Sequence, residues 1–109
     1  LDGAWPEGAR FSNYRKDPAR GAAMAARFVG ERSLEATARY REIAREAGLA
    51  LSTLAIAFSL AHDFVGSTLI GATQVAQLDE TLAAAEIELS PEVLTACHRV
   101  SREIPYPLG

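Results

Sequence analysis

The chain has 109 residues, of which 49% are hydrophobic and 23% are charged, and its formal net charge at pH 7 is −3. This composition excludes a disordered chain, a collagen-like chain and, because Cys97 is the only cysteine, a disulfide scaffold. The acidic balance predicts no nucleic-acid partner, and the lack of a roughly 20-residue apolar run or a signal pattern predicts no membrane partner and a cytoplasmic location.

Residues 1–32 are predicted to form a loop with one weak helix, because glycines and prolines interrupt all of this segment except residues 22–29. Six of the eleven Lys and Arg residues lie here, so the segment is mildly basic. A loop of more than about 20 residues is unusual in a compact domain and indicates a functional excursion or a segment of a larger fold. The start at Leu1, which is not a methionine, favours the second interpretation.

Two helices are predicted after this loop. The first begins at Ser33 as its N-cap, carries apolar residues at helical spacing and is closed by Gly48. The second begins at Ser52 and runs to about His62, with apolar residues on nearly every side. A helix without a polar face needs cover on most sides, so we expect this one to be largely enclosed.

Residues 65–70 are predicted to form a buried parallel strand. They are a short run with β-branched residues, bounded by Asp63 and Gly71. A lone strand cannot satisfy its backbone hydrogen bonds, so this strand requires partner strands that the visible sequence does not supply.

Two further helices are predicted towards the end of the chain. One follows Thr73 and carries four residues that we expect to point inward, namely Val75, Leu78, Leu82 and Ala85. The other has Ser90 as its N-cap and Pro91 at its first position, and Pro105 stops it. Helices that alternate with a strand belong to an α/β fold, but one strand is too few for a complete α/β domain. We therefore interpret the chain as a piece of a larger α/β protein.

Four stretches resemble the aldo/keto reductase family, in the correct order. Residues 67–82, STLIGATQVAQLDETL, resemble the last barrel strand and the following helix of that family. Residues 43–58 resemble its penultimate helical region, and residues 89–92, LSPE, resemble the start of its C-terminal helix. Residues 1–14 are similar to the long loop after the seventh strand in the branch that includes the potassium-channel β-subunit-like reductases. The resemblance covers nearly the whole chain and corresponds to the C-terminal third of the family.

The resemblance implies an α/β fold, as the C-terminal fragment of a (β/α)₈ TIM barrel that is mostly helical here with one buried strand. Residues 1–32 would be the loop after the seventh strand, and residues 33–109 the final helices and last strand. The implied activity is NAD(P)H-dependent reduction of aldehydes or ketones, with NADPH as cofactor, NADH not excluded, and a small-molecule carbonyl substrate. The family's catalytic Asp, Tyr, Lys and His lie on earlier strands, so the resemblance assigns no catalytic residue and predicts an inactive fragment.

Six residues are expected, by the same resemblance, to bind the cofactor: Gly71, Ala72, Thr73, Gln77, Glu80 and Thr81. Gly71 and Ala72 leave room for a ligand near the backbone. Thr73 offers a hydroxyl where a helix begins, and the N–H groups and dipole of that helix suit a phosphate. The resemblance assigns Thr73 and Gln77 to the adenosine phosphate region and Glu80 to the adenine. An ordinary helix cap is the alternative role of Thr73.

Three residues carry weaker chemical signals. His62 is interpreted as a residue that stabilises the C-terminus of a helix, and not as an acid–base partner of Asp63. His98 has no further ligands near it in sequence, so we expect no zinc site there. Cys97 lies on the apolar stripe of the last predicted helix and is interpreted as a small core residue.

Loop residues leave two alternatives open. Arg10, Arg15 and Lys16 either contact the cofactor pyrophosphate or belong to a solvated loop. Trp5 and the tail of residues 105–107, which includes Tyr106, wall a substrate pocket, or else the tail packs on the outside of the barrel. The alternative function for the whole chain is a non-enzymatic helical interaction module that self-associates. An unpaired strand edge and an apolar helix both favour association.

Overall fold

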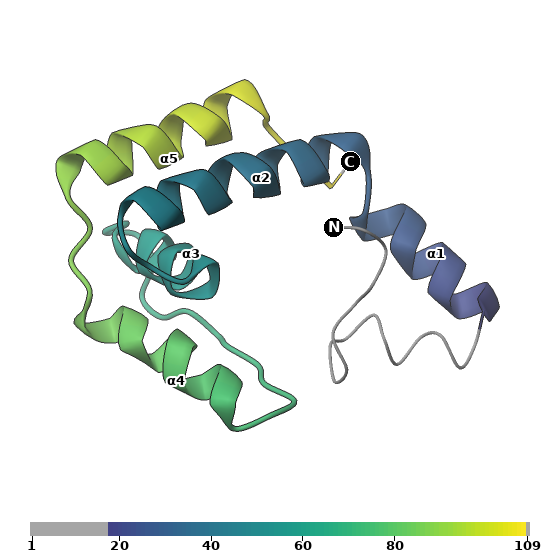
Figure 1. Cartoon of the computed structure of the whole chain (residues 1–109), viewed down its shortest axis with the longest axis horizontal. Helices are drawn as coiled ribbons and strands as arrows, with labels where there is room; N and C mark the ends of the chain where they lie inside the picture. The colour runs from purple at the N-terminus through teal and green to yellow at the C-terminus, as the bar shows by residue number, and fades with distance from the viewer. Residues whose placement is uncertain (1–17, 109) are drawn as a thin grey trace.

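The computed structural model describes residues 18–108 (Figure 1). The elements follow in the order α1 (Pro18–Phe28), α2 (Glu31–Glu46), α3 (Leu51–Leu60), α4 (Ala76–Ala83), the 3₁₀ turn η2 (Ala84–Glu86) and α5 (Pro91–Glu103). This part of the chain is therefore built from helices and connecting turns, and contains no strand.

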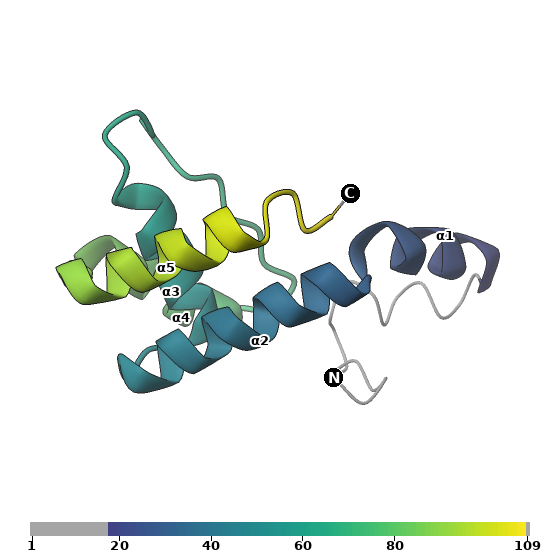
Figure 2. The ribbon, with the colours of Figure 1, turned by 90° about the horizontal axis from the view of Figure 1, so that it is seen from above.

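Helices α2 and α5 lie side by side and run in opposite directions (Figures 1 and 2). Helix α3 packs against α2 on one side and against α4 and η2 on the other. Helix α1 extends away from this group in both views. Helix α3 is therefore the element that joins α4 to the α2–α5 pair.

The core lies where α2, α3, η2 and α5 meet. Its two largest fully buried side chains are Leu54 of α3, which is 1% exposed, and Cys97 of α5, which is 0% exposed. The other buried members are Ala44, Ala57, Ala84 and Leu89. Small alanine side chains allow the helices to approach closely around these two residues. Cys97 is thus confirmed as a core residue.

Two polar contacts connect the α2–α5 pair at one end. Arg39 Nη2 lies 2.6 Å from Glu103 Oε2. Arg32 donates from Nη2 to the carbonyl oxygen of Pro105 at 2.9 Å. Both contacts are at least partly exposed, so we expect them to orient the end of α5 more than to stabilise it.

The signals for helix ends at Gly48 and Ser90 are confirmed. Gly48 has a φ of +69°, a left-handed conformation that glycine adopts without strain, and it follows the end of α2. Ser90 is the N-cap of α5, and its Oγ accepts a hydrogen bond from the N–H of Val93 at 3.3 Å. Pro91 occupies the first turn, and α5 ends before Pro105.

Three predicted helix boundaries are wrong. Helix α2 begins before Ser33, whose Oγ accepts from the Gly30 N–H at 2.9 Å and donates to the Gly30 carbonyl at 2.8 Å. Ser33 therefore holds the N-cap residue from inside the first turn. Helix α3 begins before Ser52: its N-cap is Ala50, which has no polar side chain, and the Ser52 hydroxyl bonds Glu80 of α4. The weak helix expected within residues 1–32 is present as α1, but it begins at Pro18 and not near residue 22, and α2 also begins in this segment; residues 1–17 lie outside the described part.

The predicted strand at residues 65–70 is wrong. This segment belongs to the irregular connection between α3 and α4, which projects from the helices in Figure 2. Residues 18–108 contain no strand that could pair with it, so its backbone has no sheet partner. The predicted burial is wrong as well, because Leu69 is 94% exposed. The described part of the chain is all-helical where an α/β arrangement was expected.

Helix α4 is less buried than its sequence pattern predicts. Leu78 is half-buried, whereas Val75, Leu82 and Ala85 are exposed. The cause is that α4 packs against α3 and η2 on one side only. The prediction that all four side chains point inward is therefore wrong for three of them.

Helix α3 is apolar nearly all round, and its neighbours cover only part of it. Leu54 and Ala57 are buried, whereas Ala55 and Leu60 are exposed, so the expected enclosure is incomplete. Beside it lies an apolar hollow of about 380 Å³, lined by Thr37, Tyr40, Leu51, Leu54, Ala55, Phe58 and Cys97.

Within residues 18–108 no single helix is long and apolar enough to cross a membrane, and α2 with α3 reaches that length and composition only as a pair bent by 93°.

The burial of Cys97 predicts a pH-dependent stability. Burial raises the pKa of the Cys97 thiol above its ordinary value of 9.0. On alkalinisation the unfolded chain therefore releases this proton before the folded chain does. The contribution of the neutral thiol to stability is complete below pH 9 and is lost as the pH rises through the folded-state pKa.

We expect an aromatic disulfide reagent to label Cys97 slowly in the native chain and rapidly in concentrated urea. The absorbance of the released aromatic thiol, at about pH 8, measures the rate of labelling. Rapid labelling without denaturant would contradict the placement of Cys97 in the core.

Candidate functional site

The six predicted cofactor-binding residues belong to one surface segment, residues 71–81; three of the six precede α4 and three lie within it. Five of them are exposed, and Thr81 is half-buried. Helix α3 packs against α4 and supports this surface from the core side. The predicted residues are therefore both adjacent and accessible to a ligand.

Thr73 and Gln77 are in direct contact. The backbone N–H of Thr73 donates to Gln77 Oε1 at 2.9 Å, and Thr73 Oγ1 donates to the same oxygen at 3.3 Å. The two donors of Thr73 therefore share one acceptor, the side-chain amide oxygen of Gln77. A phosphate oxygen that binds these donors must displace it, and the Gln77 amide NH₂ is then a further donor for the anion.

Thr73 is not the N-cap of α4. The helix begins at Ala76, its N-cap is Val75, and no side chain caps it. The first turn is tightened by backbone bonds such as that from the Gln77 N–H to the Gln74 carbonyl at 3.2 Å. The prediction that a helix begins at Thr73 is therefore wrong, and so is the alternative that Thr73 is an ordinary cap.

Glu80 is held by two adjacent hydroxyl groups of α3. Ser52 Oγ donates to Glu80 Oε2 at 2.6 Å, and Thr53 Oγ1 donates to the backbone carbonyl of Glu80 at 2.8 Å. Glu80 is among the last four residues of α4, whose carbonyls lack α-helical partners. Thr53 supplies one such partner and is itself only 5% exposed. These contacts hold both the main chain and the side chain of Glu80.

The hydroxyl of Thr81 is turned back on its own helix. Its Oγ1 lies 3.0 Å from the carbonyl oxygen of Gln77 and 3.2 Å from that of Leu78, and donates to them. A threonine hydroxyl has one proton, so this arrangement engages its only donor. Towards a ligand, Thr81 therefore offers an acceptor and not a donor.

Gly71 and Ala72 leave the loop before α4 open. A Cβ added at Gly71 would meet no atom within 4 Å, and Gly71 does not have a left-handed φ. Neither packing nor backbone conformation in the described part of the chain therefore requires glycine at this position. The space beside the backbone is available to a ligand.

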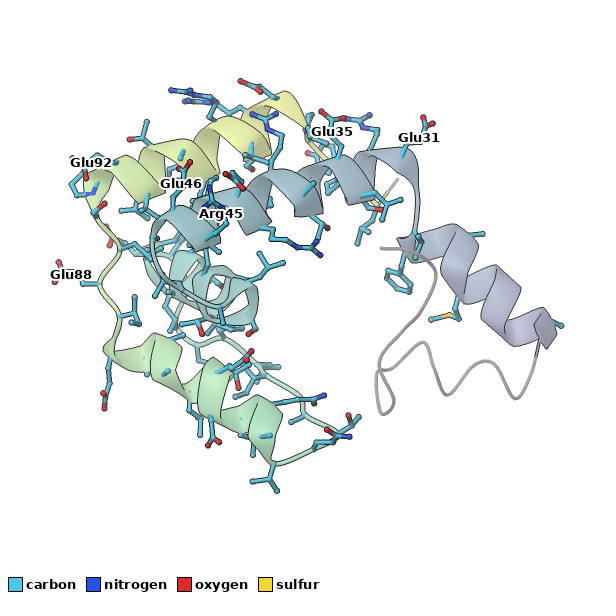
Figure 3. All side chains as sticks on the ribbon, viewed as in Figure 1. Glu31, Glu35, Arg45, Glu46, Glu88 and Glu92 are labelled. Atoms are coloured by element: carbon cyan, nitrogen blue, oxygen red, sulfur yellow. The ribbon has the colours of Figure 1, made fainter. Side chains whose placement is uncertain are left out.

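The surface carries little positive charge. No Lys or Arg lies between residues 71 and 81, whereas Asp79 and Glu80 do. The charged residues labelled in Figure 3 lie along α2 and around the start of α5, away from the start of α4. Arg45 on α2 forms an ion pair with Glu42 that lowers the pKa of this carboxyl and raises that of the guanidinium. Residues 71–81 therefore offer a ligand neutral donors and carboxylates.

The histidines lie at a different place. His62 Nδ1 is 2.7 Å from the carbonyl oxygen of Phe58, which confirms the predicted contact with the end of a helix. The His62 ring is 5.3 Å from that of His98 and 4.9 Å from that of Phe58, in edge-on arrangements. Within residues 18–108, no group of three or more His, Cys, Asp or Glu is placed to hold a metal ion.

Sequence reasoning missed Ser52 and Thr53 as neighbours of the site. The sequence pattern predicts Ser52 as a helix cap, and Thr53 is one of the few polar residues in an otherwise apolar helix. That second observation was the available signal, because a buried polar group needs a hydrogen-bond partner. Among the loop residues, Trp5, Arg10, Arg15 and Lys16 lie outside the described residues, and Tyr106 is exposed.

Comparison with known proteins gives one consistent result. The model of the aldo/keto reductase family matches residues 3–102, a region that includes all six predicted site residues. The chain is 36% identical over 107 residues to Protein tas of Escherichia coli (strain K12), and to Protein tas of Shigella flexneri. The aligned region is 98% of this chain and 29% of each relative. The chain thus spans less than a third of the length of the curated relatives it matches.

Proposed function

The chain belongs to the aldo/keto reductase family, and we propose that residues 71–81 bind the adenosine end of an NADPH cofactor in a complete reductase. The proposed reaction is the reduction of an aldehyde or ketone to an alcohol, with a small-molecule carbonyl compound as substrate. The family implies a parent protein that is an NAD(P)-dependent oxidoreductase. The finer assignment, to the C-terminal third and the potassium-channel β-subunit-like branch, is supported by the resemblance of residues 1–14 and 67–82.

The observation that carries the proposal is the contact between Thr73 and Gln77 at the exposed start of α4. Two donors of Thr73 face one oxygen, at 2.9 Å and 3.3 Å. Such a convergence suits an oxygen of a phosphate group. The N-terminus of a helix adds further N–H groups and a favourable dipole for an anion.

The hydrogen-bonding groups of residues 71–81 suit both the phosphate and the adenine of an adenosine phosphate. Thr73 and Gln77 supply neutral donors for the phosphate, and the Glu80 carboxylate supplies an acceptor for the adenine. Neutral donors bind phosphate less strongly than Arg or Lys. We therefore expect a modest preference for NADPH over NADH.

The residues of this chain bind and orient the cofactor and do not transfer protons. When bound, the cofactor supplies the hydride, and its reactive ring lies at the end opposite the adenosine. In this proposal the proton donor belongs to other segments of the barrel. The 109-residue chain alone is expected to show no turnover.

Replacing Thr73 or Gln77 by Ala in the complete reductase should raise the Kd for NADPH by about five- to tenfold, the effect of losing about one hydrogen bond. The Kd for NADH should change less, because NADH lacks the 2′-phosphate. Quenching or a shift of cofactor fluorescence measures both constants. Gln74→Ala is the matched control, since Gln74 is exposed beside the site and has no assigned contact with the cofactor. Equal losses for both cofactors, or no loss, would refute the phosphate role.

A separate observation favours a second candidate function. The connection between α3 and α4 and its flanks expose several large apolar side chains, namely Phe64, Leu69, Ile70, Val75 and Leu82. Large exposed apolar side chains, together with a segment that has no strand partner within residues 18–108, favour association with another chain. In this alternative the chain is a non-enzymatic helical module that associates with itself.

Sedimentation of the 109-residue chain distinguishes the two functions. The alternative requires a dimer that Leu69→Lys dissociates and that has no affinity for NADPH. A folded monomer would contradict it.

A further inference from the structure

The geometry points to Ser52 of α3 as a positioning residue for cofactor recognition. Ser52 holds the Glu80 carboxylate so that its second oxygen accepts a hydrogen bond from the adenine ring. This inference rests on the proposed function, because it requires that Glu80 contacts the adenine. It adds to that function a residue on another helix, 28 positions earlier in the chain.

The contact between Ser52 and Glu80 engages one carboxylate oxygen and leaves the other available. Ser52 Oγ donates to Oε2 at 2.6 Å, and a bond to an ionised acceptor is stronger than one between neutral groups. Ser52 lies in the first turn of α3, close to Leu54, which anchors that helix in the core. The hydroxyl is therefore presented from a fixed position.

Two adjacent residues of α3 restrain different parts of Glu80. Thr53 Oγ1 donates to the Glu80 main-chain carbonyl at 2.8 Å and so fixes where the side chain begins. Ser52 fixes where the side chain ends. A glutamate that is restrained at both ends loses less rotamer freedom when a ligand binds, and this loss otherwise weakens binding.

The chemistry of a carboxylate makes the contact selective. An ionised carboxylate accepts hydrogen bonds and does not donate them, and the adenine ring edge carries one donor group, its exocyclic amine. A hypoxanthine ring carries a carbonyl oxygen at the same place, which a carboxylate repels, and its own donor, N1–H, lies on the neighbouring ring atom. Glu80 in its restrained position should therefore favour adenine over hypoxanthine, and Ser52 should be required for the full preference.

The test compares the affinity of the complete reductase for NADPH and for its reduced hypoxanthine analogue by cofactor fluorescence. Ser52→Ala should raise the Kd for NADPH by about three- to tenfold and leave the Kd for the analogue nearly unchanged. Ser52→Thr keeps the hydroxyl and should keep the preference. Glu80→Ala should abolish the preference, and adding Ser52→Ala to it should have no further effect.

Ser59→Ala is the matched control, because Ser59 is a hydroxyl residue of the same helix that bonds Thr68 at 3.0 Å and not Glu80. It should leave the preference for adenine intact. Two results would overturn the inference, because Ser52 would then act through the fold alone. One is that Ser52→Ala weakens the binding of both cofactors equally. The other is that Ser52→Ala weakens the binding of NADPH as much in the Glu80→Ala variant as in the wild-type enzyme. An enzyme that does not distinguish the two cofactors would overturn it too.

The substitutions at Thr73 and Gln77 report on the proposed function separately. If they weaken the binding of NADPH as expected while Ser52→Ala changes neither Kd, the proposed function stands and the role of Ser52 is refuted. If they change nothing either, the proposed function is refuted as well.

Discussion

Replacing Leu54 by Ala is expected to lower the free energy of unfolding of the 109-residue chain by about 2–5 kcal/mol. Leu54 is 1% exposed and belongs to the buried cluster that joins α2, α3, η2 and α5. Its truncation loses the transfer free energy of the removed methyl groups and leaves a cavity that rigid helices fill only in part. Since small domains are stable by about 5–15 kcal/mol, this single change removes a large share of the total.

Urea unfolding followed by circular dichroism measures the effect, with an unchanged slope as evidence that the folded and unfolded states remain comparable. Leu60→Ala is the matched control, because Leu60 lies on the same helix and is exposed. It should cost about 1 kcal/mol or less. Similar losses at Leu54 and Leu60 would contradict the placement of the core on the Leu54 side of α3.

Thr53→Val is expected to destabilise the chain by about 1–3 kcal/mol although it preserves the shape of the side chain. Thr53 is 5% exposed, and its hydroxyl is a partner of the Glu80 carbonyl at 2.8 Å. Valine removes the donor and leaves that carbonyl with one partner fewer at the end of α4. The loss should be concentrated in α4, because this bond joins α4 to α3.

Urea unfolding measures the overall loss, and amide hydrogen exchange should be accelerated more in α4 than in α5. Thr95→Val is the control, since Thr95 is an exposed threonine on α5. It should change stability by about 0.5 kcal/mol or less. An effect of Thr53→Val that is no larger than that of Thr95→Val would contradict the contact with Glu80.

The candidate site was predictable in part. Its segment, residues 71–81, was identified from a resemblance of residue order, which does not depend on knowing how the chain packs. The contact between Thr73 and Gln77 joins residues four positions apart and is local. The contacts of Ser52 and Thr53 with Glu80 span 28 and 27 positions, and no pattern within one helix specifies such a pair.

The predicted strand shows a different limit of sequence reasoning. Residues 65–70 have strand-like composition, but a strand forms only when a partner supplies the other half of its hydrogen bonds. Within residues 18–108 no strand provides that half, and the segment is an exposed connection with Leu69 at its surface. The composition therefore indicates that the segment could form a strand. Within residues 18–108 it forms none, because no partner strand packs beside it.

Several helix ends follow from the local sequence alone. Gly48, Ser90 and Pro105 act through bonds and steric limits that reach four residues or so along the chain, and each performs its predicted role. Three features follow from the packing of the helices instead: which side of α3 is buried, the exposure of most apolar residues around α4, and which oxygen of Glu80 accepts a hydrogen bond. These features depend on which helices meet across the core, and that outcome is set by interactions between residues far apart in the chain.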